Sequence, residues 1–333
     1  MRIDATGRLS HYVDHLAPTW LALPEDERGT FWVPEGLVEH AARRGVEAEP
    51  YRGQAVPWEP GDGPLLVAAW QDQERAKATG RPVAYQGHGV GQAFGNPDGT
   101  RRRHYSGGEG FEAVRLFLAA NERHAALWRT AYPAAETVVV GCPKLGGRSR
   151  EGGPRGTLVV ASFHFPAVVP KTPEANTAWR DYRAALPELA RHFDFALHSH
   201  PRFRKVIRAE AQRIGVPFIE DFAEVLDRAA VYLNDASSTL WEFAAFGGPV
   251  VVLNSPRFRR DVHHGLRFWD CADVGPQVNH RRELVAAVRR ALADPPDLAA
   301  RRREIAAELY QTDDPAERAA AALLALTRAP ALA

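Results

Sequence analysis

"VYLNDASSTLWEFAAFGGPVVVLN", residues 231–254, is the stretch that decides the fold. Its apolar start is typical of a buried strand, which stops at the polar residues Asn234 to Ser238. A helical pattern with a lone acid, Glu242, follows, and "PVVVLN" then predicts a second buried strand. Strand, crossover helix and strand together indicate a parallel α/β sheet. Such sheets bind ligands beyond the carboxyl ends of their strands, so we expect something polar to bind where the first strand stops.

The rest of the chain repeats this alternation, and it predicts two Rossmann-like doubly wound α/β domains facing a cleft. Residues 146–156, "GGRSREGGPRG", interrupt the pattern as a linker would. We expect an N-terminal acceptor-side domain over 1–145 and a C-terminal nucleotide-binding domain over 157–333, whose last part is a helical tail. Within the first domain the pattern predicts a long helix near 109–130.

Composition places the chain among ordinary folded proteins. It has 333 residues, a formal net charge of +1 and 2 cysteines, with no CxxC pair. The near-zero charge argues against a nucleic-acid partner, and the cysteines favour a reducing compartment. The amino terminus lacks the apolar core of a signal peptide, so a cytoplasmic location is expected, with peripheral contact at the inner face of a membrane left open.

The polar cluster after the first quoted strand suits a phosphate group. Ser237 and Ser238 would cap the following helix, whose unpaired amides and dipole attract an anion, with Asp235 beside them. Glu242 would lie about one turn further on, where its carboxylate could accept hydrogen bonds from ribose hydroxyls. The alternative is a plain serine cap with a first-turn acid, a pattern found at many helices.

Two other strand ends carry candidate residues. "LHSHPRF" places His200 and Arg202 where a strand stops before a proline, as a second anion contact. "YQGHGVG" places His88 between two glycines, where the backbone can approach a ligand. A histidine that only bonds a loop carbonyl is the alternative for both. His11 and His15, four residues apart, lack an evident third metal ligand and are interpreted as cleft or surface residues.

Several familiar mechanisms lack their motifs. The sequence contains no HExxH, P-loop or GxSxG, which removes the usual signatures of zinc proteases, nucleoside triphosphatases and serine hydrolases. No DxD-type acid pair stands out, so we expect a reaction that needs neither a metal nor another cofactor.

Taken together, these segments resemble the CDP-glycerol glycerophosphotransferases, the teichoic acid polymerase-like family, which has the glycosyltransferase B (GT-B) fold. The family's His-Pro, Asp-Tyr-Ser-Ser and Gly-x-Pro-Arg/Lys segments correspond here to "LHSHPRF", "NDASS" and "GCPKL". Its closing Asp-Gly-x-x-x-x-Arg segment corresponds to "DDPAER", with Arg318 in the place of the arginine.

The resemblance implies a role for each matching residue. His88 matches the general base that takes a proton from the acceptor hydroxyl, and His200 matches a histidine that helps hold the donor phosphates. Ser237 and Ser238 match the pair that grips the diphosphate. Ala236 replaces the family's tyrosine, and Val90 follows the His-Gly where the family has threonine, so the donor is left open.

We therefore expect a metal-independent transferase that moves a glycerophosphate or glycosyl group from a nucleotide-diphosphate donor to a hydroxyl of a glycan, polyol or lipid-linked acceptor. The first alternative is a nucleotide-sugar 2-epimerase or hydrolase of the same fold, whose Asp-Ser-Gly-Gly-x-x-Glu segment differs from the Ser-Ser found here. A non-enzymatic nucleic-acid-binding protein is the remaining one. The sequence leaves the oligomeric state open.

Overall fold

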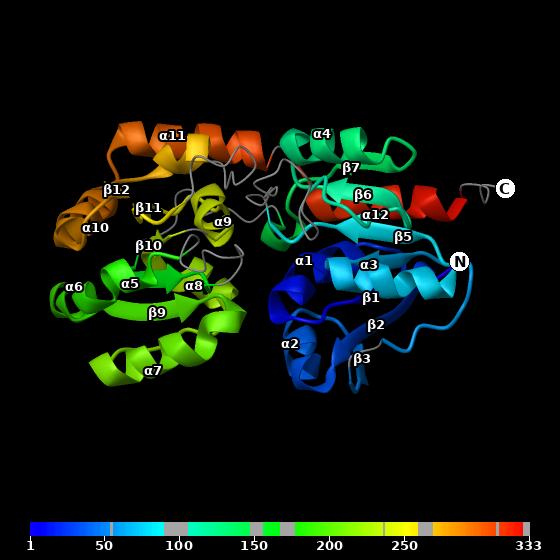
Figure 1. Ribbon diagram of the computed structural model, residues 1–333, viewed down its shortest axis with the longest axis horizontal. Coiled ribbons are helices and arrows are strands. Elements are labelled where there is room, and N and C mark those ends of the chain that lie inside the picture. The colour runs from blue at the N-terminus through cyan, green and yellow to red at the C-terminus, as the bar shows by residue number, and fades with distance from the viewer. Residues whose placement is uncertain are drawn as a thin grey trace. The chain divides into compact units, whose positions relative to one another are not determined.

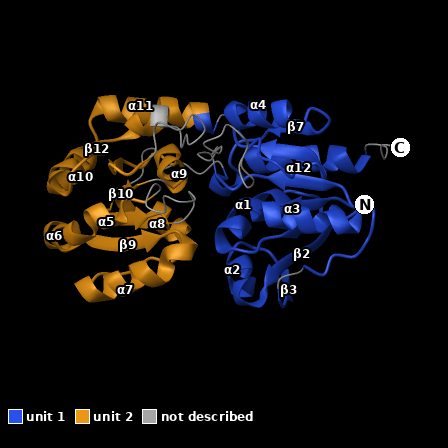
Figure 2. Cartoon of the chain, in the orientation of Figure 1, with its two compact units in different colours: residues 1–147, 309–333 blue, residues 148–308 orange. Residues whose placement is uncertain are grey.

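The chain forms two compact units, residues 1–147 with 309–333, and residues 148–308 (Figure 2). The computed structural model describes residues 1–53, 56–89, 106–146, 156–166, 177–235, 237–258, 269–310 and 313–328. Both units are parallel α/β sheets, as the alternation of strand and helix patterns predicts.

Unit 1 contains a seven-stranded sheet in the order β3-β2-β1-β4-β5-β6-β7. Its strands are β1 Ile3–Thr6, β2 Arg28–Pro34, β3 Ala48–Tyr51, β4 Leu65–Val67, β5 Val83–Gln86, β6 Val114–Ala119 and β7 Glu136–Val139. Strand order reverses between β1 and β4. This reversal is the topological switch point, where helices leave the sheet on opposite faces and open a crevice for a ligand.

Helices cover both faces of this sheet (Figure 1). They are α1 Ser10–Leu21, α2 Val38–Arg43, α3 Trp70–Ala76, α4 Glu122–Ala131 and α12 Pro315–Arg328. Leu16 of α1 and Leu323 of α12 belong to one buried core with β1, and Trp128 of α4 belongs to a second core with β5 and β6. The two cores fix the sheet from both sides, because each strand alternates its side chains between them.

The tail helix belongs to unit 1. Leu323 and Ala319 of α12 are fully buried against α1 and β6, the core they share. We expected this tail in the second domain, whereas its contacts with α1 and β6 place it in unit 1. Apolar periodicity predicts that α12 has a buried face but does not identify the surface that covers it.

The prediction of one long helix near 109–130 is wrong. Val114–Ala119 is strand β6, paired with β5 and β7, and five of its six residues are buried. Helix α4 begins only at Glu122, after Asn121, whose Oδ1 accepts a hydrogen bond from the backbone N–H of His124 at 3.0 Å. A strand buried on both faces has no alternation, so its short apolar run is easily taken for part of the adjoining helix.

Unit 2 contains a five-stranded sheet in the order β12-β11-β10-β8-β9. Its strands are β8 Leu158–Phe163, β9 Phe195–Ser199, β10 Ala229–Asn234, β11 Val250–Leu253 and β12 Gln277–Val278. Its helices are α5 Trp179–Tyr182, α6 Leu186–His192, α7 Arg204–Ile214, α8 Phe222–Arg228, α9 Thr239–Ala245, α10 Leu284–Ala293 and α11 Pro296–Leu309, whose last residue falls in unit 1. The switch point of this unit lies between β8 and β10.

The quoted stretch folds as its pattern predicts, into β10, α9 and β11. The return from α9 to β11 depends on two glycines. Gly247 has a φ of 93°, in the left-handed region that favours glycine. A Cβ on Gly248 would lie 2.0 Å from the ring of Phe243, a fully buried residue of α9. The helix can therefore pack on its sheet only with glycine at this turn.

Candidate functional site

The polar residues of unit 2 gather at its switch point. Asp235 follows β10 and His164 follows β8, the two strands between which the sheet order reverses. The carboxylate of Asp235 accepts hydrogen bonds from the backbone N–H of His164 at 3.0 Å and of Ala178 at 2.8 Å. Asp235 is 1% exposed, so its carboxylate joins the two sides of the switch point from beneath the surface.

The two serines differ in their bonding. Ser237 donates its N–H to Oδ1 of Asn234 at 2.9 Å, and its Oγ accepts from the N–H of Thr239 at 3.4 Å. Ser238 is the N-cap residue directly before α9, and its buried Oγ has no hydrogen-bond partner among the residues that the structure describes. A buried hydroxyl without a partner is rare in proteins and is typical of a site that a ligand or water completes.

Glu242 lies in the first turn of α9, as the sequence predicts, but it is 1% exposed. A carboxylate this deeply buried does not present its oxygens to solvent. Contact with ribose hydroxyls therefore stays a prediction, and it would require the surface above α9 to open.

His200 and Arg202 lie together with two residues that the sequence analysis missed, His164 and Phe165. The ring of His200 is 4.9 Å from that of His164 and 4.5 Å from that of Phe165, and the Arg202 guanidinium lies 5.3 Å from the centre of the Phe165 ring. Nδ1 of His200 accepts a hydrogen bond from the N–H of Arg202 at 3.2 Å. Its Nε2 therefore carries the proton of the neutral ring and can donate to an anion.

His164 could have been predicted from the sequence by the same rule as the other site residues. It directly follows the strand "TLVVASF", as His200 follows "FALHS". Because parallel strands end at one edge of a sheet, the first polar residue after every strand is a candidate site residue.

In unit 1 the candidate histidines form one cluster beside the switch point. The ring of His88 lies 5.4 Å from that of His11 and 4.5 Å from that of Tyr12. Nδ1 of His88 donates to the carbonyl oxygen of Ala68, the residue after β4, at 2.8 Å. Because a carbonyl only accepts, this bond places the proton on Nδ1 and leaves Nε2 of a neutral ring as the base.

His15 belongs to the same cluster but is buried. Its pKa is lowered well below the usual value, first by burial and then by the charges of Lys144 and His88. Lys144 lies in the "GCPKL" segment, within the 3-10 turn Pro143–Leu145 that contacts α1. His15 is therefore neutral at pH 7.

Arg318 is placed apart from this cluster. It lies on α12, and its Nη2 donates to the carbonyl oxygen of Val139, at the end of β7, at 3.4 Å. Strand β7 is at the edge of the sheet, three strands beyond β4. A role for Arg318 in binding stays a prediction.

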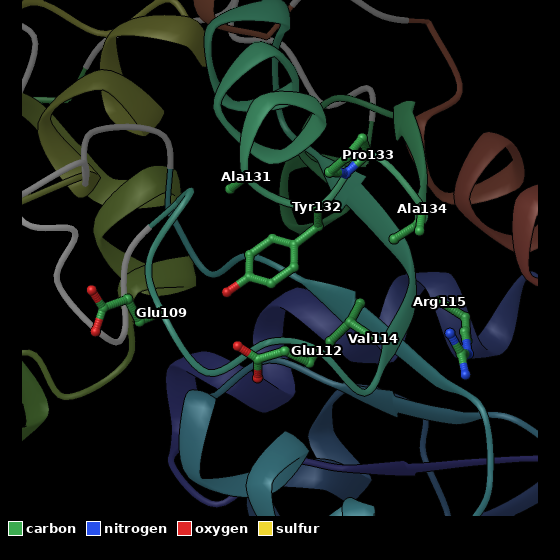
Figure 3. A pocket seen from close by; sticks show the side chains of 9 residues that line it. Glu109, Glu112, Val114, Arg115, Ala131, Tyr132, Pro133 and Ala134 are labelled. Carbon is green, nitrogen blue, oxygen red and sulfur yellow. The ribbon is translucent and has the colours of Figure 1, made fainter.

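A cavity of about 340 Å³ lies beside the amino end of β6 in unit 1 (Figure 3). Glu109, Glu112, Tyr132 and Arg115 help to line it, together with Val114, the first residue of β6. It is therefore at the amino ends of the strands, away from the histidines. Parallel sheets rarely place their ligands there, so the cavity is not the candidate site.

Two further features of the described residues concern metal binding and membrane insertion. Among the described residues, no three His, Cys, Asp or Glu side chains are grouped as metal ligands. No described helix is both long enough and apolar enough to cross a bilayer. The sequence has two runs of three arginines, at 101–103 and 301–303. The first lies outside the described part of the chain, and in the second Arg301 pairs with Asp273.

No protein-family model matches the sequence, and no curated protein matches it. Solved structures do match the fold. The wall teichoic acid polymerase TagF, from a crystal soaked with CDPG, matches with a TM-score of 0.69 at 9% identity, over 98% of this chain and 88% of that one. UDP-GlcNAc 2-epimerase of Methanocaldococcus jannaschii, in complex with UDP-GlcNAc and UDP, matches with a TM-score of 0.64 at 12% identity, over 98% and 100%. The Staphylococcus aureus MnaA–UDP structure matches with a TM-score of 0.60 at 15% identity, over 95% and 94%.

These likenesses, together with the parallel sheets of seven and five strands, confirm that the chain has the GT-B fold. The sequence identities are too low to assign a family within it.

Proposed function

We propose that the chain is an enzyme acting on a nucleotide-diphosphate-linked substrate, whose diphosphate is bound at the β8/β10 switch point of unit 2. The observation that carries the proposal is the buried, unpartnered Oγ of Ser238 at that point. It lies in the segment in which the sequence predicts phosphate binding. The nearby His200 and Arg202 supply donors and positive charge for the same group.

Two reactions fit such a substrate. Epimerisation or hydrolysis of a nucleotide sugar is supported by the similarity to several UDP-GlcNAc 2-epimerase structures, that of Methanocaldococcus jannaschii among them. Transfer of a glycerophosphate or glycosyl group to a hydroxyl is supported by the similarity to TagF and by the place of His88, whose Nδ1 donates to a carbonyl oxygen at the end of β4. We place epimerisation or hydrolysis first because more of these structures support it, and we keep transfer as the second candidate.

Both candidate reactions assign the same roles to the residues of this chain. Ser237, Ser238 and His200 would hold the diphosphate and stabilise the charge that develops on it, as preorganised donors do in other enzymes. His88 would remove a proton, from the sugar in epimerisation or from an acceptor hydroxyl in transfer. A base with a pKa near neutrality suits either step.

Product analysis separates the two reactions. The protein is incubated with UDP-GlcNAc or CDP-glycerol, with and without a polyol or glycan acceptor, and the products are resolved by mass spectrometry and NMR. Epimerised or hydrolysed sugar formed without acceptor supports the first candidate, and product formed only with acceptor supports the second. The proposal fails if UDP, CDP, GDP and dTDP all leave the melting temperature unchanged at millimolar concentration, because a bound ligand must raise stability.

The substitution His88→Gln tests whether His88 is the base that removes the proton. Turnover should fall by about 100-fold or more, the range of a lost general base, while nucleotide affinity is unchanged. His192→Gln, at an exposed histidine of α6, is the matched control and should keep full turnover. A fall in nucleotide affinity with His88→Gln, or turnover equal to wild type, contradicts the assignment.

A further inference from the structure

Asp72 is a buried carboxyl group that the proposed reaction does not use. It is the third residue of α3, the helix that follows β4, and so lies at the switch point of unit 1. It is 0% exposed, and neither carboxylate oxygen accepts a hydrogen bond within the described part of the chain. Buried carboxylates are normally paired and hydrogen-bonded, so such a residue indicates a functional site.

Arg8 is the partner of Asp72 across the switch point. Its Nη1 lies 3.2 Å from Oδ1 of Asp72, without the alignment of a hydrogen bond. Arg8 lies in the loop between β1 and α1, three residues before His11, and its side chain is 22% exposed. Arg8 thus contacts a buried acid while part of its side chain stays accessible to a ligand.

Charged and titratable side chains from neighbouring elements interact electrostatically with Asp72. Arg75 approaches from the same helix, Tyr51 from the end of β3 and Tyr85 from β5. Burial raises the pKa of Asp72 to about 7, although Arg8 and Arg75 act in the opposite direction. The pKa values of both tyrosines are raised, mainly by burial, so neither ionises near neutrality.

We propose that Arg8 and Asp72 form a proton-coupled anion site, in which Arg8 binds a phosphate or carboxylate group of the substrate while Asp72 takes up a proton. An anion beside Arg8 would repel the carboxylate and favour its neutral form. By reciprocity, protonation of Asp72 strengthens anion binding. The site goes beyond the proposed function, on which it rests only for the identity of the ligand as a substrate.

The direction of the pH effect follows from this coupling. Below pH 7 Asp72 is neutral, and the charge of Arg8 is available to a ligand. Above pH 7 the carboxylate compensates that charge, so anion affinity falls as pH rises through the pKa. His11, His88 and His15 also change the local charge at lower pH, and a variant of Asp72 separates its contribution from theirs.

Sulfate is the probe, because it stays doubly charged between pH 6 and 8. Calorimetric titration of the full chain in two buffers of different ionisation enthalpy measures proton uptake on binding. The wild type should take up as much as about half a proton per sulfate at pH 7 through Asp72, since a group at its pKa is half protonated. Asp72→Asn should lose this uptake and bind sulfate about fivefold more tightly at pH 8, because a nearby opposing charge is gone.

Matched variants locate the effect. Arg8→Gln should abolish binding at this site. Glu74→Gln removes a negative charge from the same helix, where Glu74 pairs with Lys77, and should leave affinity and proton uptake as in the wild type. If Asp72→Asn does not fold, the side-chain carboxyl carbon of Asp72 is titrated by NMR in the wild type, where sulfate should raise its pKa.

Each outcome decides between the two proposals. If proton uptake is equal in Asp72→Asn and wild type, or if sulfate leaves the carboxyl pKa unchanged, the coupled site is overturned. Unchanged sulfate affinity in Arg8→Gln overturns it as well. These results leave intact the nucleotide binding of unit 2, which is measured with UDP and CDP and with His200→Gln. Sulfate binding that depends on Arg8 supports the site even if every nucleotide fails to bind.

Discussion

Asp235 shows how one residue can serve the site without facing the ligand. The sequence suggests a direct contact with the donor. The structure gives both carboxylate oxygens to backbone N–H groups of His164 and Ala178, which belong to the segments after β8 and before α5. We infer that Asp235 orders the loop carrying His164 and acts on the substrate through that loop.

Asp235→Asn tests this role. An amide keeps one acceptor but places an NH₂ group against a backbone N–H, which leaves a buried donor without a partner and costs about 2 kcal/mol of unfolding free energy. Chemical denaturation measures the change, and Glu188→Gln, at an exposed acid of α6, is the control with no expected change. Lower nucleotide affinity at unchanged stability would instead indicate a direct ligand contact.

At the scale of elements, the sequence predicts strands that stand out as separate apolar runs. β10, α9 and β11 are predicted because a polar cluster separates two apolar runs. β6 is missed because its apolar residues join the pattern of α4, and β1 because its four residues are too few to stand out as a run. The apolar segment "VPFIED" has the length and composition of a strand, but it forms only one bridge, between Phe218 and Leu197.

The features of the candidate site likewise divide into those that the sequence predicts and those that it does not. His88, His200, Ser237 and Ser238 were found because each follows a predicted strand. The meeting of His11 with His88 could not be predicted, because it depends on how α1 packs beside β5. Burial of Asp235 and Glu242 was also beyond the sequence, since exposure is set by the elements that cover a residue.

The turn between α9 and β11 gives a prediction at this scale. Gly248→Ala should lower the unfolding free energy by about 1 to 3 kcal/mol, the usual range for overpacking, because the new Cβ would collide with the ring of Phe243. Gly36→Ala is the matched control, since its Cβ would meet nothing within 4 Å. Equal melting temperatures for the two variants would show that α9 moves freely on its sheet.

At the scale of the whole molecule, the chain crosses between units twice. Unit 1 contains residues 1–147 and 309–333, so its last helix is separated in sequence from all its strands by unit 2. The GT-B likeness covers almost the full chain although identity is 15% or lower in the structures compared. A fold can persist at this identity because it needs apolar positions and turn glycines more than particular side chains.

Removal of residues 313–333 tests the place of α12. The truncated chain should lose about 4 kcal/mol or more of unit 1 stability, because burial of Leu323 and four alanines of α12 is lost. Hydrogen exchange should show weaker protection of β1 and β6, with β8 and β10 of unit 2 as the internal control. Equal loss of protection in both units would mean that they unfold as one.

Because α12 packs on unit 1 but follows unit 2 in the sequence, it also affects the order in which the two units can fold during synthesis. All seven strands of unit 1 are translated before unit 2, yet the helix that covers Leu16 is translated only after it. Unit 2 can thus fold while the amino-terminal sheet keeps an apolar surface uncovered until α12 has been synthesised.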